Sequence, residues 1–288
     1  MAKDTPTETQ LQDPTAPNTA VEPSAVPAGL ADPPAASNGF PPPIIQLKNL
    51  TKRFGSKVIL DKINLDIPEK RITVVMGGSG HGKSTILKLI VGFLTPEEGE
   101  VIIDGQNVLN LPRQAKLEVQ KKLGMSFQYS ALFDSMSVFE NVAFPLREHT
   151  KLPENEIEDR VYTILERLGL PDVGTKMPSE LSGGMKKRVG VARSIMMQPK
   201  IMLFDEPESG LDPITTTAIG DLILEMRDDF HMSCVVISHH LENTMRIADK
   251  VAMLYKSHFI AQGTPEEMKA HDDPVLQQFL KGEAQGPF

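Results

Sequence analysis

A glycine-rich run has the composition and spacing of a loop that binds phosphate: Gly77, Gly78, Ser79, Gly80, His81, Gly82, Lys83, Ser84 and Thr85. Glycines let the backbone curl tightly, so that consecutive N–H groups can point at phosphate oxygens. Lys83 adds a cation for the β- and γ-phosphates, and the Ser84 hydroxyl can bind Mg²⁺. We therefore predict that residues 77–85 bind a nucleoside triphosphate.

The segments on either side of this loop are those that a phosphate-binding loop requires. Residues 71–76 are apolar and β-branched, which indicates a buried strand, and residues 85–90 repeat apolar side chains at helical spacing. The helix would present the positive end of its dipole to the same anion. The alternative is a plain glycine-rich turn between a strand and a helix, with no ligand.

Composition and charge limit the classes of protein that this chain can belong to. Its 288 residues are 40% hydrophobic and 24% charged, as in a globular protein of one or two domains. No run approaches 18 apolar residues, and the N-terminus lacks the apolar region of a signal peptide, so we expect a cytosolic protein without membrane spans. The lone Cys234, in an apolar run, is expected to be an inert core residue. The net charge of −8 comes mainly from the two ends of the chain, and the near-neutral body argues against nucleic-acid binding.

Changes of composition along the chain predict three regions. Residues 1–43 are rich in proline and alanine and nearly free of large apolar groups, so we expect a disordered tail; a ligand for a proline-recognition module is the alternative. Residues 44–265 form the main domain, with a helical subdomain at about 129–190. Residues 266–288 form a C-terminal extension with a short amphipathic helix, for which Asp273 and Pro274 are suitable first residues.

Alternation of apolar and polar residues predicts the strands that must position the chemistry. Residues 44–50 and 58–67 read as half-buried antiparallel strands. Residues 201–204 form a continuous apolar run, residues 233–238 repeat that pattern between two serines, and both segments read as parallel strands. Parallel strands deliver ligands to the edge at their carboxyl ends. We therefore expect the glycine-rich loop, the pair Asp205-Glu206 and His239 to meet at one edge.

The remaining segments contribute helices and polar side chains. Residues 123–128 read as a strand that ends in Gln128, and residues 129–150 read as an aromatic, loop-rich stretch. A helix is predicted over 154–168, where Gly169 can stop it, and a second from Ser182, a good N-cap, to Ile195.

Six motifs in order make the chain similar to the ATP-binding-cassette (ABC) ATPases. They are the phosphate loop, Gln128, Leu181-Ser182-Gly183-Gly184, Asp205-Glu206-Pro207, Ser209-Gly210-Leu211-Asp212 and Ser238-His239. The resemblance implies the P-loop NTPase fold of ABC ATPases: a RecA-like α/β core with a parallel sheet, an antiparallel β subdomain and an α-helical signature subdomain. It also implies ATP hydrolysis with ATP and Mg²⁺ as cofactors.

The resemblance assigns roles to individual residues. Asp205, Ser84 and Gln128 would hold Mg²⁺, and Glu206 would be the general base for the attacking water. Gln128 would also bind that water as a catalytic residue, and His239 would orient the water and the γ-phosphate. Two assignments have structural alternatives when each is taken alone. Asp205-Glu206 could be a turn at the end of a strand, and His239 could be a histidine at a strand end whose hydrogen bonds are satisfied within the protein. The order of the motifs outweighs both.

Other assigned residues bind the rest of the nucleotide. Phe54 could stack on adenine, and the alternative is core packing in a hairpin. His81 is an unusual residue for such a loop; it is assigned to nucleotide binding with the rest of the loop, and the alternative is that it faces solvent. The signature residues Ser182, Gly183 and Gly184 would reach the ATP of a second subunit, with Asp212 helping the two faces communicate, which implies a homodimer.

A finer resemblance links residues 131–150 to the ATPases of Mla/MCE-type lipid transport systems. It implies a subunit that drives phospholipid transport from the cytoplasmic face of the bacterial inner membrane. Its partners would be a membrane permease and a periplasmic MCE-type lipid-binding protein, and the resemblance allows a small cytoplasmic regulatory subunit. Two alternatives are an importer for a small polar solute and a soluble ABC ATPase outside transport.

Five apolar residues of this stretch are candidates for a groove that receives a permease helix, with Arg147 and Glu148 at its rim. They are Leu132, Phe133, Phe139, Phe144 and Leu146. The alternative is that they pack the core of the helical subdomain. His240, which stands where many family members have aspartate, is expected to have little effect on hydrolysis.

Overall fold

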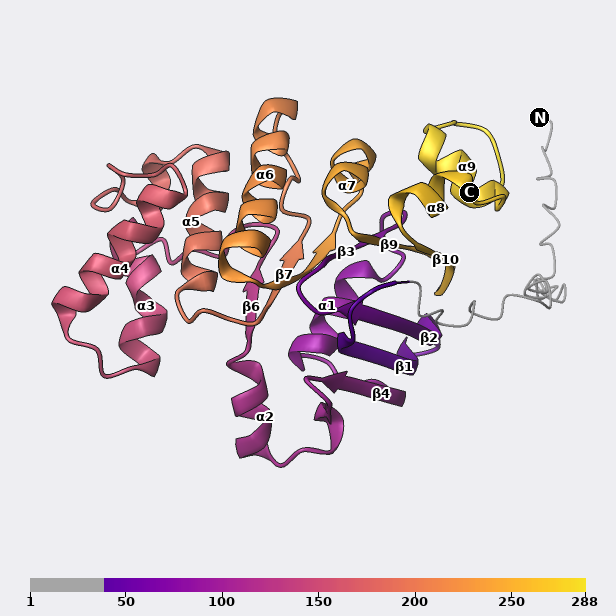
Figure 1. Cartoon of the computed structure of the whole chain (residues 1–288), viewed down its shortest axis with the longest axis horizontal. Helices are drawn as coiled ribbons and strands as arrows, with labels where there is room; N and C mark the ends of the chain where they lie inside the picture. Colours follow the sequence, from indigo (N-terminus) through magenta and orange to yellow (C-terminus); the bar gives the residue numbers. More distant parts are fainter. Residues whose placement is uncertain (1–38) are drawn as a thin grey trace, which may run out of the picture. The chain divides into compact units, whose positions relative to one another are not determined.

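The computed structural model of the chain describes residues 39–288. The predicted tail therefore lies outside the described residues up to residue 38, and the first strand begins at Pro43. Two sheets form in the described range. One has four strands in the order β2-β1-β4-β5, and the other has six strands in the order β10-β9-β3-β8-β7-β6 (Figure 1).

The four-stranded sheet is antiparallel, as the alternating sequence predicts. It contains β1 (Pro43–Phe54), β2 (Lys57–Pro68), β4 (Glu98–Ile103) and β5 (Gln106–Asn107). Apolar side chains of β1 and β2 such as Ile45, Leu47 and Ile67 are buried, while the polar residues between them are more exposed. The register of β1 and β2 ends at the pair of Phe54 and Lys57. The hairpin turn therefore holds Phe54 at one end of this sheet.

The six-stranded sheet is parallel except at one edge. It contains β3 (Ile72–Met76), β6 (Leu123–Ser126), β7 (Ile201–Asp205), β8 (Ser233–Ile237), β9 (Lys250–Tyr255) and β10 (His258–Gly263). β10 runs antiparallel to β9, and the other pairs are parallel. β3 and β8 are buried along their whole length, which confirms the prediction of strands buried on both faces.

Nine α-helices are assigned within residues 39–288 (Figure 1). They are α1 (Lys83–Val91), α2 (Arg113–Gln120), α3 (Val138–His149), α4 (Glu154–Arg167), α5 (Gly183–Ile195), α6 (Pro213–Phe230), α7 (Leu241–Ile247), α8 (Pro265–Ala270) and α9 (Pro274–Lys281). α3 packs against α4 and α5. In this part of the chain no helix is long and apolar enough to cross a membrane.

The interpretation of residues 129–150 as loop-rich is wrong for the second half of the stretch. α3 covers Val138–His149 and begins with a capping box, in which the Ser137 hydroxyl accepts the Glu140 N–H and the Glu140 carboxylate accepts the Ser137 N–H. This Ser-x-x-Glu pattern is a start signal for a helix. Pro145 within the segment argued against a helix, but the buried side chains of α3 stabilise it by packing.

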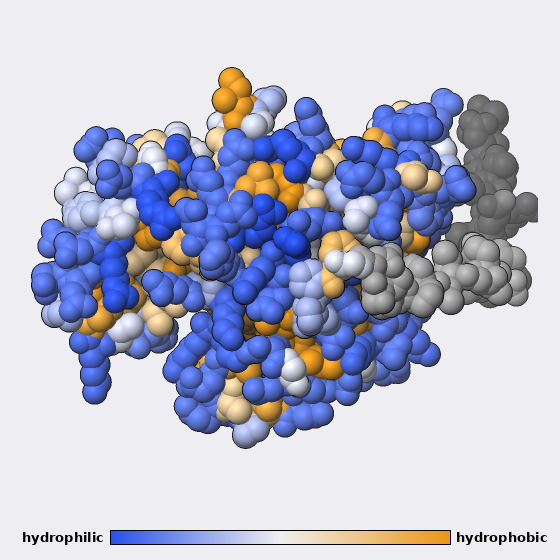
Figure 2. Space-filling view, in the orientation of Figure 1, coloured by the Kyte–Doolittle hydropathy of each residue, from blue (hydrophilic) through white to orange (hydrophobic). Residues whose placement is uncertain are grey.

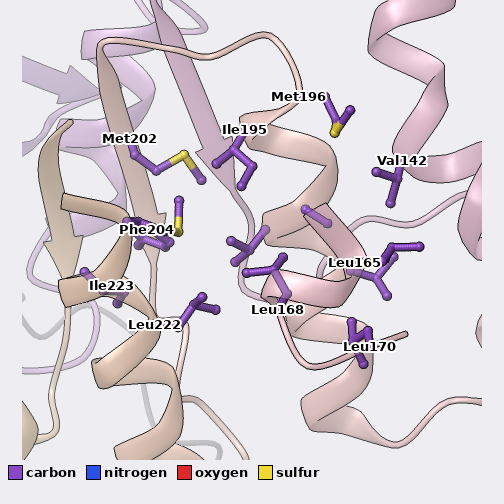
Figure 3. Packing of buried hydrophobic residues seen from close by; sticks show 14 of the residues in the cluster. Val142, Leu165, Leu168, Leu170, Ile195, Met196, Met202, Phe204, Leu222 and Ile223 are labelled. Carbon is purple, nitrogen blue, oxygen red and sulfur yellow. The ribbon is translucent and has the colours of Figure 1, made fainter. Parts of the chain in front are cut away.

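One hydrophobic cluster joins the helices to the parallel sheet (Figure 3). Labelled members of the cluster include Val142 of α3, Leu165 of α4, Ile195 of α5, Phe204 of β7, and Leu222 and Ile223 of α6. Cys234 belongs to the same cluster, and burial raises the pKa of its thiol to about 12. A thiol with that pKa stays protonated at neutral pH, in agreement with the prediction of an inert core cysteine.

The C-terminal helices pack on the edge of the parallel sheet. Leu276 of α9 is fully buried, and Phe279 is partly buried in the same cluster as residues of β9 and β10. Beyond α9 the chain returns toward the sheet, because the Tyr255 hydroxyl donates a hydrogen bond to the Pro287 carbonyl at 2.9 Å. The Phe288 ring lies 5.4 Å from that of Tyr255 and 5.1 Å from that of Phe279.

Candidate nucleotide-binding site

The glycine-rich loop follows β3 and leads into α1, and two of its glycines have no room for a side chain. At Gly77, with φ +148°, a Cβ atom would lie 2.3 Å from the Leu254 carbonyl oxygen. At Gly82, with φ +102°, it would lie 2.7 Å from a methyl group of Ile59. Backbone curvature and close packing therefore both require glycine at these positions.

Lys83 holds the loop in a closed curve. Its ammonium group donates hydrogen bonds to the carbonyl oxygens of Gly77 and Gly78, both at 3.0 Å. The side chain is only 4% exposed, and burial lowers its pKa, whereas the carboxylates of Glu206 and Asp205 act in the opposite direction. Ser79 and Gly80 form the exposed tip of the loop. An anion at the tip would meet a cation at the start of α1.

His81 does not face solvent, which was the alternative stated for it. Its ring is half-buried, with its centroid 5.6 Å from that of Tyr255 and 5.8 Å from that of Phe288. The Nδ1 atom is buried and has no hydrogen-bond partner among residues 39–288. The His81 side chain is covered because the chain beyond α9 returns to the phosphate loop and brings Phe288 against it.

Ser84 and Asp205 come together beside the loop. The Ser84 hydroxyl donates a hydrogen bond to the Asp205 carboxylate at 2.8 Å. Burial raises the pKa of Asp205, and the negative charge of Glu206 adds to this effect, while the hydrogen bond from Ser84 opposes it. A hydroxyl and a carboxylate at this separation are oxygen donors of the kind that Mg²⁺ prefers. The pair therefore fits a magnesium ion that also binds phosphate.

The carboxylate of Glu206 collects side chains from three other segments. The Gln128 amide nitrogen lies 3.1 Å from its Oε2, and His239 Nδ1 and Lys83 Nζ lie 3.6 and 3.9 Å from its Oε1. Glu206 follows β7, Gln128 follows β6, His239 follows β8 and Lys83 follows β3. Four parallel strands therefore supply one cluster at their carboxyl ends. The predicted meeting of the loop, Asp205-Glu206 and His239 is found in the structure.

Gln128 lies against Glu206 and not against the predicted metal ligands. Its amide nitrogen also donates to the Ser209 hydroxyl at 3.3 Å. Within the described residues, no hydrogen bond joins Gln128 to Ser84 or Asp205. The arrangement connects Gln128 with the group proposed as the base.

Glu206 combines a strained backbone with a shielded carboxylate. Its φ of +47° is left-handed, which costs a non-glycine residue on the order of 1 kcal/mol, and the side chain is 18% exposed. A carboxylate flanked by an amide and an imidazole can accept a proton from a water molecule held between them. The chemistry that this cluster supports is hydrolysis of a bound phosphate ester or anhydride.

Phe54 lies at the end of the hairpin that approaches the phosphate loop. The ring is 49% exposed and has the Lys52 ammonium group 5.4 Å from its centroid. Ile59, which contacts the Cβ position of Gly82, lies on the paired strand two residues beyond Lys57. The alternative of core packing is therefore wrong, and Phe54 is free to stack on a base beside the loop.

Ser182 and Gly183 of the signature lie on a second exposed surface, whereas Gly184 is buried. Ser182 caps α5, with its hydroxyl accepting the Met185 N–H at 3.3 Å, and Gly183 and Gly184 form the first turn. Asp212 caps α6, and hydrogen bonds from Thr215 lower the pKa of its carboxyl.

The start of α5 lies beside the start of α6. A Cβ atom at Gly184 would lie 2.8 Å from the Thr215 methyl group. Ile214, in the first turn of α6, is 84% exposed, and Figure 2 shows apolar surface at the end of this helix. No hydrogen bond or ion pair within residues 39–288 joins Ser182, Gly183, Gly184 or Asp212 to the phosphate loop. Two helix N-termini side by side offer an anion-binding surface to another molecule.

Sequence reasoning did not find two residues that support the cluster. Lys187 of α5 donates to the Ser209 carbonyl oxygen at 2.7 Å, and Glu208 is buried in the turn after Glu206. The position of Glu208 directly after Asp205-Glu206-Pro207 was visible in the sequence. Its burial was not, because it depends on β8, some thirty residues further along the chain.

A groove of about 690 Å³ opens between α2, α3 and the end of β6. Phe133 and Phe144 both line it, and their ring centroids lie 5.0 Å apart. Leu146 is buried in the helical cluster, and Leu132 and Phe139 pack against the same cluster. Arg147 and Glu148 are exposed but are not among the residues that line the groove. Two of the five apolar candidates therefore face the groove and three belong to the core.

Known proteins are similar to this chain in amino-acid sequence. The family profile described as ABC transporter matches residues 60–209. The intermembrane phospholipid transport system ATP-binding protein MlaF of Haemophilus influenzae is 46% identical over 244 residues, which are 85% of this chain and 92% of that protein. The probable ribonucleotide transport ATP-binding protein mkl of Mycobacterium leprae is 41% identical over 244 residues, which are 85% of this chain and 70% of that protein.

A solved structure agrees with the sequence comparison. The dimeric post-hydrolysis state of the ATP-binding cassette MJ0796, bound to ADP and Pi, has a TM-score of 0.70 and 29% identity. The match covers 77% of this chain and 98% of that chain. The relatives are named as ATP-binding proteins, and the names of the two curated ones give different transported substances.

Proposed function

This chain belongs to the ABC transporter family and is an ATPase of that family, and we propose that it drives phospholipid transport at the bacterial inner membrane. The observation that carries the proposal is the 46% identity to the MlaF protein over 92% of its length. The mkl relative favours ribonucleotide as a second candidate substrate. Its match covers a smaller share of the relative, 70%, and this ranks the phospholipid first.

The proposed reaction begins with ATP on residues 77–85. The loop and Lys83 would bind the phosphates, and Phe54 would stack on the adenine. Ser84 and Asp205, with Gln128 nearby, would hold Mg²⁺, which when bound neutralises charge that develops on the transferred phosphoryl group. The Lys83 ammonium group lies 3.9 Å from the Glu206 carboxylate, so phosphate binding would give this cation a second anionic partner.

Glu206 is proposed to act as the general base. Its carboxylate would accept a proton from the attacking water, and Gln128 at 3.1 Å and His239 at 3.6 Å are close enough to orient that water. The strained backbone fixes the direction of the carboxylate before the nucleotide arrives. Lys83 would stabilise the charge on the phosphate oxygens in the transition state.

A homodimer would complete each site. Within residues 39–288, no hydrogen bond or ion pair joins Ser182 or Asp212 to the phosphate loop, and the helix N-termini that they cap would present N–H groups to an anion from another chain. The MJ0796 cassette was solved as a dimer. We propose a head-to-tail pair in which the signature of one chain faces the ATP bound by the other.

The proposed transporter places the groove against a membrane permease at the cytoplasmic face of the inner membrane. An apolar, aromatic-lined groove of about 690 Å³ can receive the apolar face of a helix. Phe133 and Phe144 would contact that helix, and Gln128, five residues before Phe133, would transmit the state of the nucleotide. A periplasmic MCE-type lipid-binding protein and a small cytoplasmic regulatory subunit complete the proposed assembly.

The substrate can be tested on the complex purified from membranes and placed in liposomes. We expect ATP-dependent movement of a fluorescent phospholipid and no ATP-dependent uptake of labelled ribonucleotide. Glu206→Gln should stop the movement of phospholipid and serves as the control. Ribonucleotide uptake without phospholipid movement would reject the proposed substrate and favour the second candidate.

A further inference from the structure

Glu208 is a buried carboxylate that the proposed mechanism does not use. It lies in the turn two residues after Glu206, and it is 3% exposed. Its Oε1 atom accepts a hydrogen bond from the Ser238 hydroxyl, whereas its Oε2 atom is buried and has no partner in residues 39–288. Burying a carboxylate oxygen without a hydrogen-bond partner costs free energy, so the presence of Glu208 at this position needs an explanation.

The Ser238 hydroxyl connects Glu208 to the backbone around His239. Ser238 is 2% exposed, and besides donating to Glu208 its hydroxyl oxygen accepts the His240 N–H at 2.9 Å. The Ser238 N–H donates to the Val75 carbonyl oxygen at 3.2 Å. Residues 238 and 240 are thus fixed on both sides of His239, whose own side chain is exposed and places its Nδ1 atom 3.6 Å from the Glu206 carboxylate.

The turn that carries Glu208 is also held from the opposite side. Lys187 of α5 donates to the carbonyl oxygens of Ser209 at 2.7 Å and Glu206 at 3.5 Å. Burial lowers the pKa of Lys187, and the charges of Glu208 and Glu206 act against this. The helix that begins at the signature and the strand that ends at His239 therefore meet through one turn.

We propose that Glu208 is a positioning residue for ATP hydrolysis. By holding the Ser238 hydroxyl, it fixes the backbone of residues 238–240 and so keeps His239 beside Glu206. The inference rests on the proposed roles of His239 and Glu206. Glu208 itself touches neither the nucleotide loop nor the imidazole, so its effect passes through Ser238.

The test measures amide hydrogen exchange and steady-state ATP turnover on the full-length chain. In Glu208→Ala we expect the amides of residues 239–240 to exchange at least tenfold faster, kcat to fall about tenfold, and KM for Mg-ATP to stay within twofold. Glu208→Gln should keep both exchange and kcat within threefold of wild type, because its amide oxygen can still accept the Ser238 hydroxyl. Glu225→Ala, an exposed carboxylate on α6, is the matched control.

The result that would overturn the proposal is unchanged exchange at residues 239–240 in folded Glu208→Ala. Faster exchange spread equally over α4 and the core strands would also overturn it, because that pattern indicates a purely structural role. If Glu208→Ala does not fold, Glu208→Met removes the same acceptor while keeping the volume of the side chain, and the same outcomes apply. Glu206→Gln that retains turnover would reject the proposed role of Glu206 as the base, whereas exchange in the Glu208 variants judges this inference by itself.

Discussion

Gly77→Ala and Gly80→Ala form a matched pair that tests the geometry of the phosphate loop. Both glycines have positive φ, +148° and +76°, so alanine is strained at either position. At Gly80 nothing lies within 4 Å of the new Cβ atom, and strain alone should cost about 1–2 kcal/mol. At Gly77 the new atom would lie 2.3 Å from the Leu254 carbonyl oxygen, which is backbone and must move. Overpacking adds about 1–3 kcal/mol, for a total of about 2–5 kcal/mol.

The assay is equilibrium unfolding in urea together with the affinity for a fluorescent ATP analogue. Gly77→Ala should lower the free energy of unfolding by more than Gly80→Ala does. It should also weaken ATP binding at least tenfold, because the shift displaces the carbonyl that Lys83 holds. The reasoning is refuted if Gly77→Ala is no less stable than Gly80→Ala and binds ATP as wild type does.

Three further predictions address the dimer, the groove and the metal ligand. Ser182→Arg should lower ATP turnover by a factor on the order of 10² while the monomer keeps its melting temperature, since the new side chain meets the partner's phosphates; full turnover would contradict the head-to-tail dimer. Phe133→Asp with Phe144→Asp should abolish co-purification with a permease but preserve ATP binding, whereas Tyr162→Asp, an exposed aromatic outside the groove, should preserve both. In the folded protein the pKa of Asp205 is raised. The free energy of unfolding therefore decreases as the pH rises from the ordinary pKa of an aspartate through the raised pKa. Asp205→Asn should therefore raise the melting temperature of the nucleotide-free protein at pH 7, by a margin that shrinks as the pH falls; an unchanged or lower melting temperature would contradict the raised pKa.

Local patterns in the sequence predicted the strands, and a family resemblance implied the fold. The alternation in residues 44–50 and 58–67 and the pattern of residues 201–204 and 233–238 predicted antiparallel and parallel strands, and the resemblance carried by the six motifs implied an ABC ATPase cassette, which the comparisons confirm. The caps at Ser182 and Asp273 are also local signals, and both are present in the structure. The strands and the helix caps depend on residues close together in the chain, so composition and spacing reveal them.

Features that depend on distant contacts could not be predicted. The packing of His81 on Phe288 joins residues about two hundred positions apart, and the burial of Glu208 depends on Ser238. Among the apolar residues of 129–150, helical phase decides that Leu146 enters the core and Phe144 lines the groove, and that phase was missed with α3 itself. The capping box at Ser137 was a readable signal that the aromatic content and Pro145 obscured.

The hydrolytic role of Glu206 is the central claim, and the ATP turnover of Glu206→Gln tests it most directly. The glutamine keeps the size and hydrogen-bonding reach of the side chain but cannot accept a proton from water. We expect ATP affinity to stay within a few-fold of wild type, turnover to fall by a factor on the order of 10² or more, and an ATP-bound dimer to accumulate. Turnover near the wild-type rate, in a variant that binds ATP normally, would show that another group is the base.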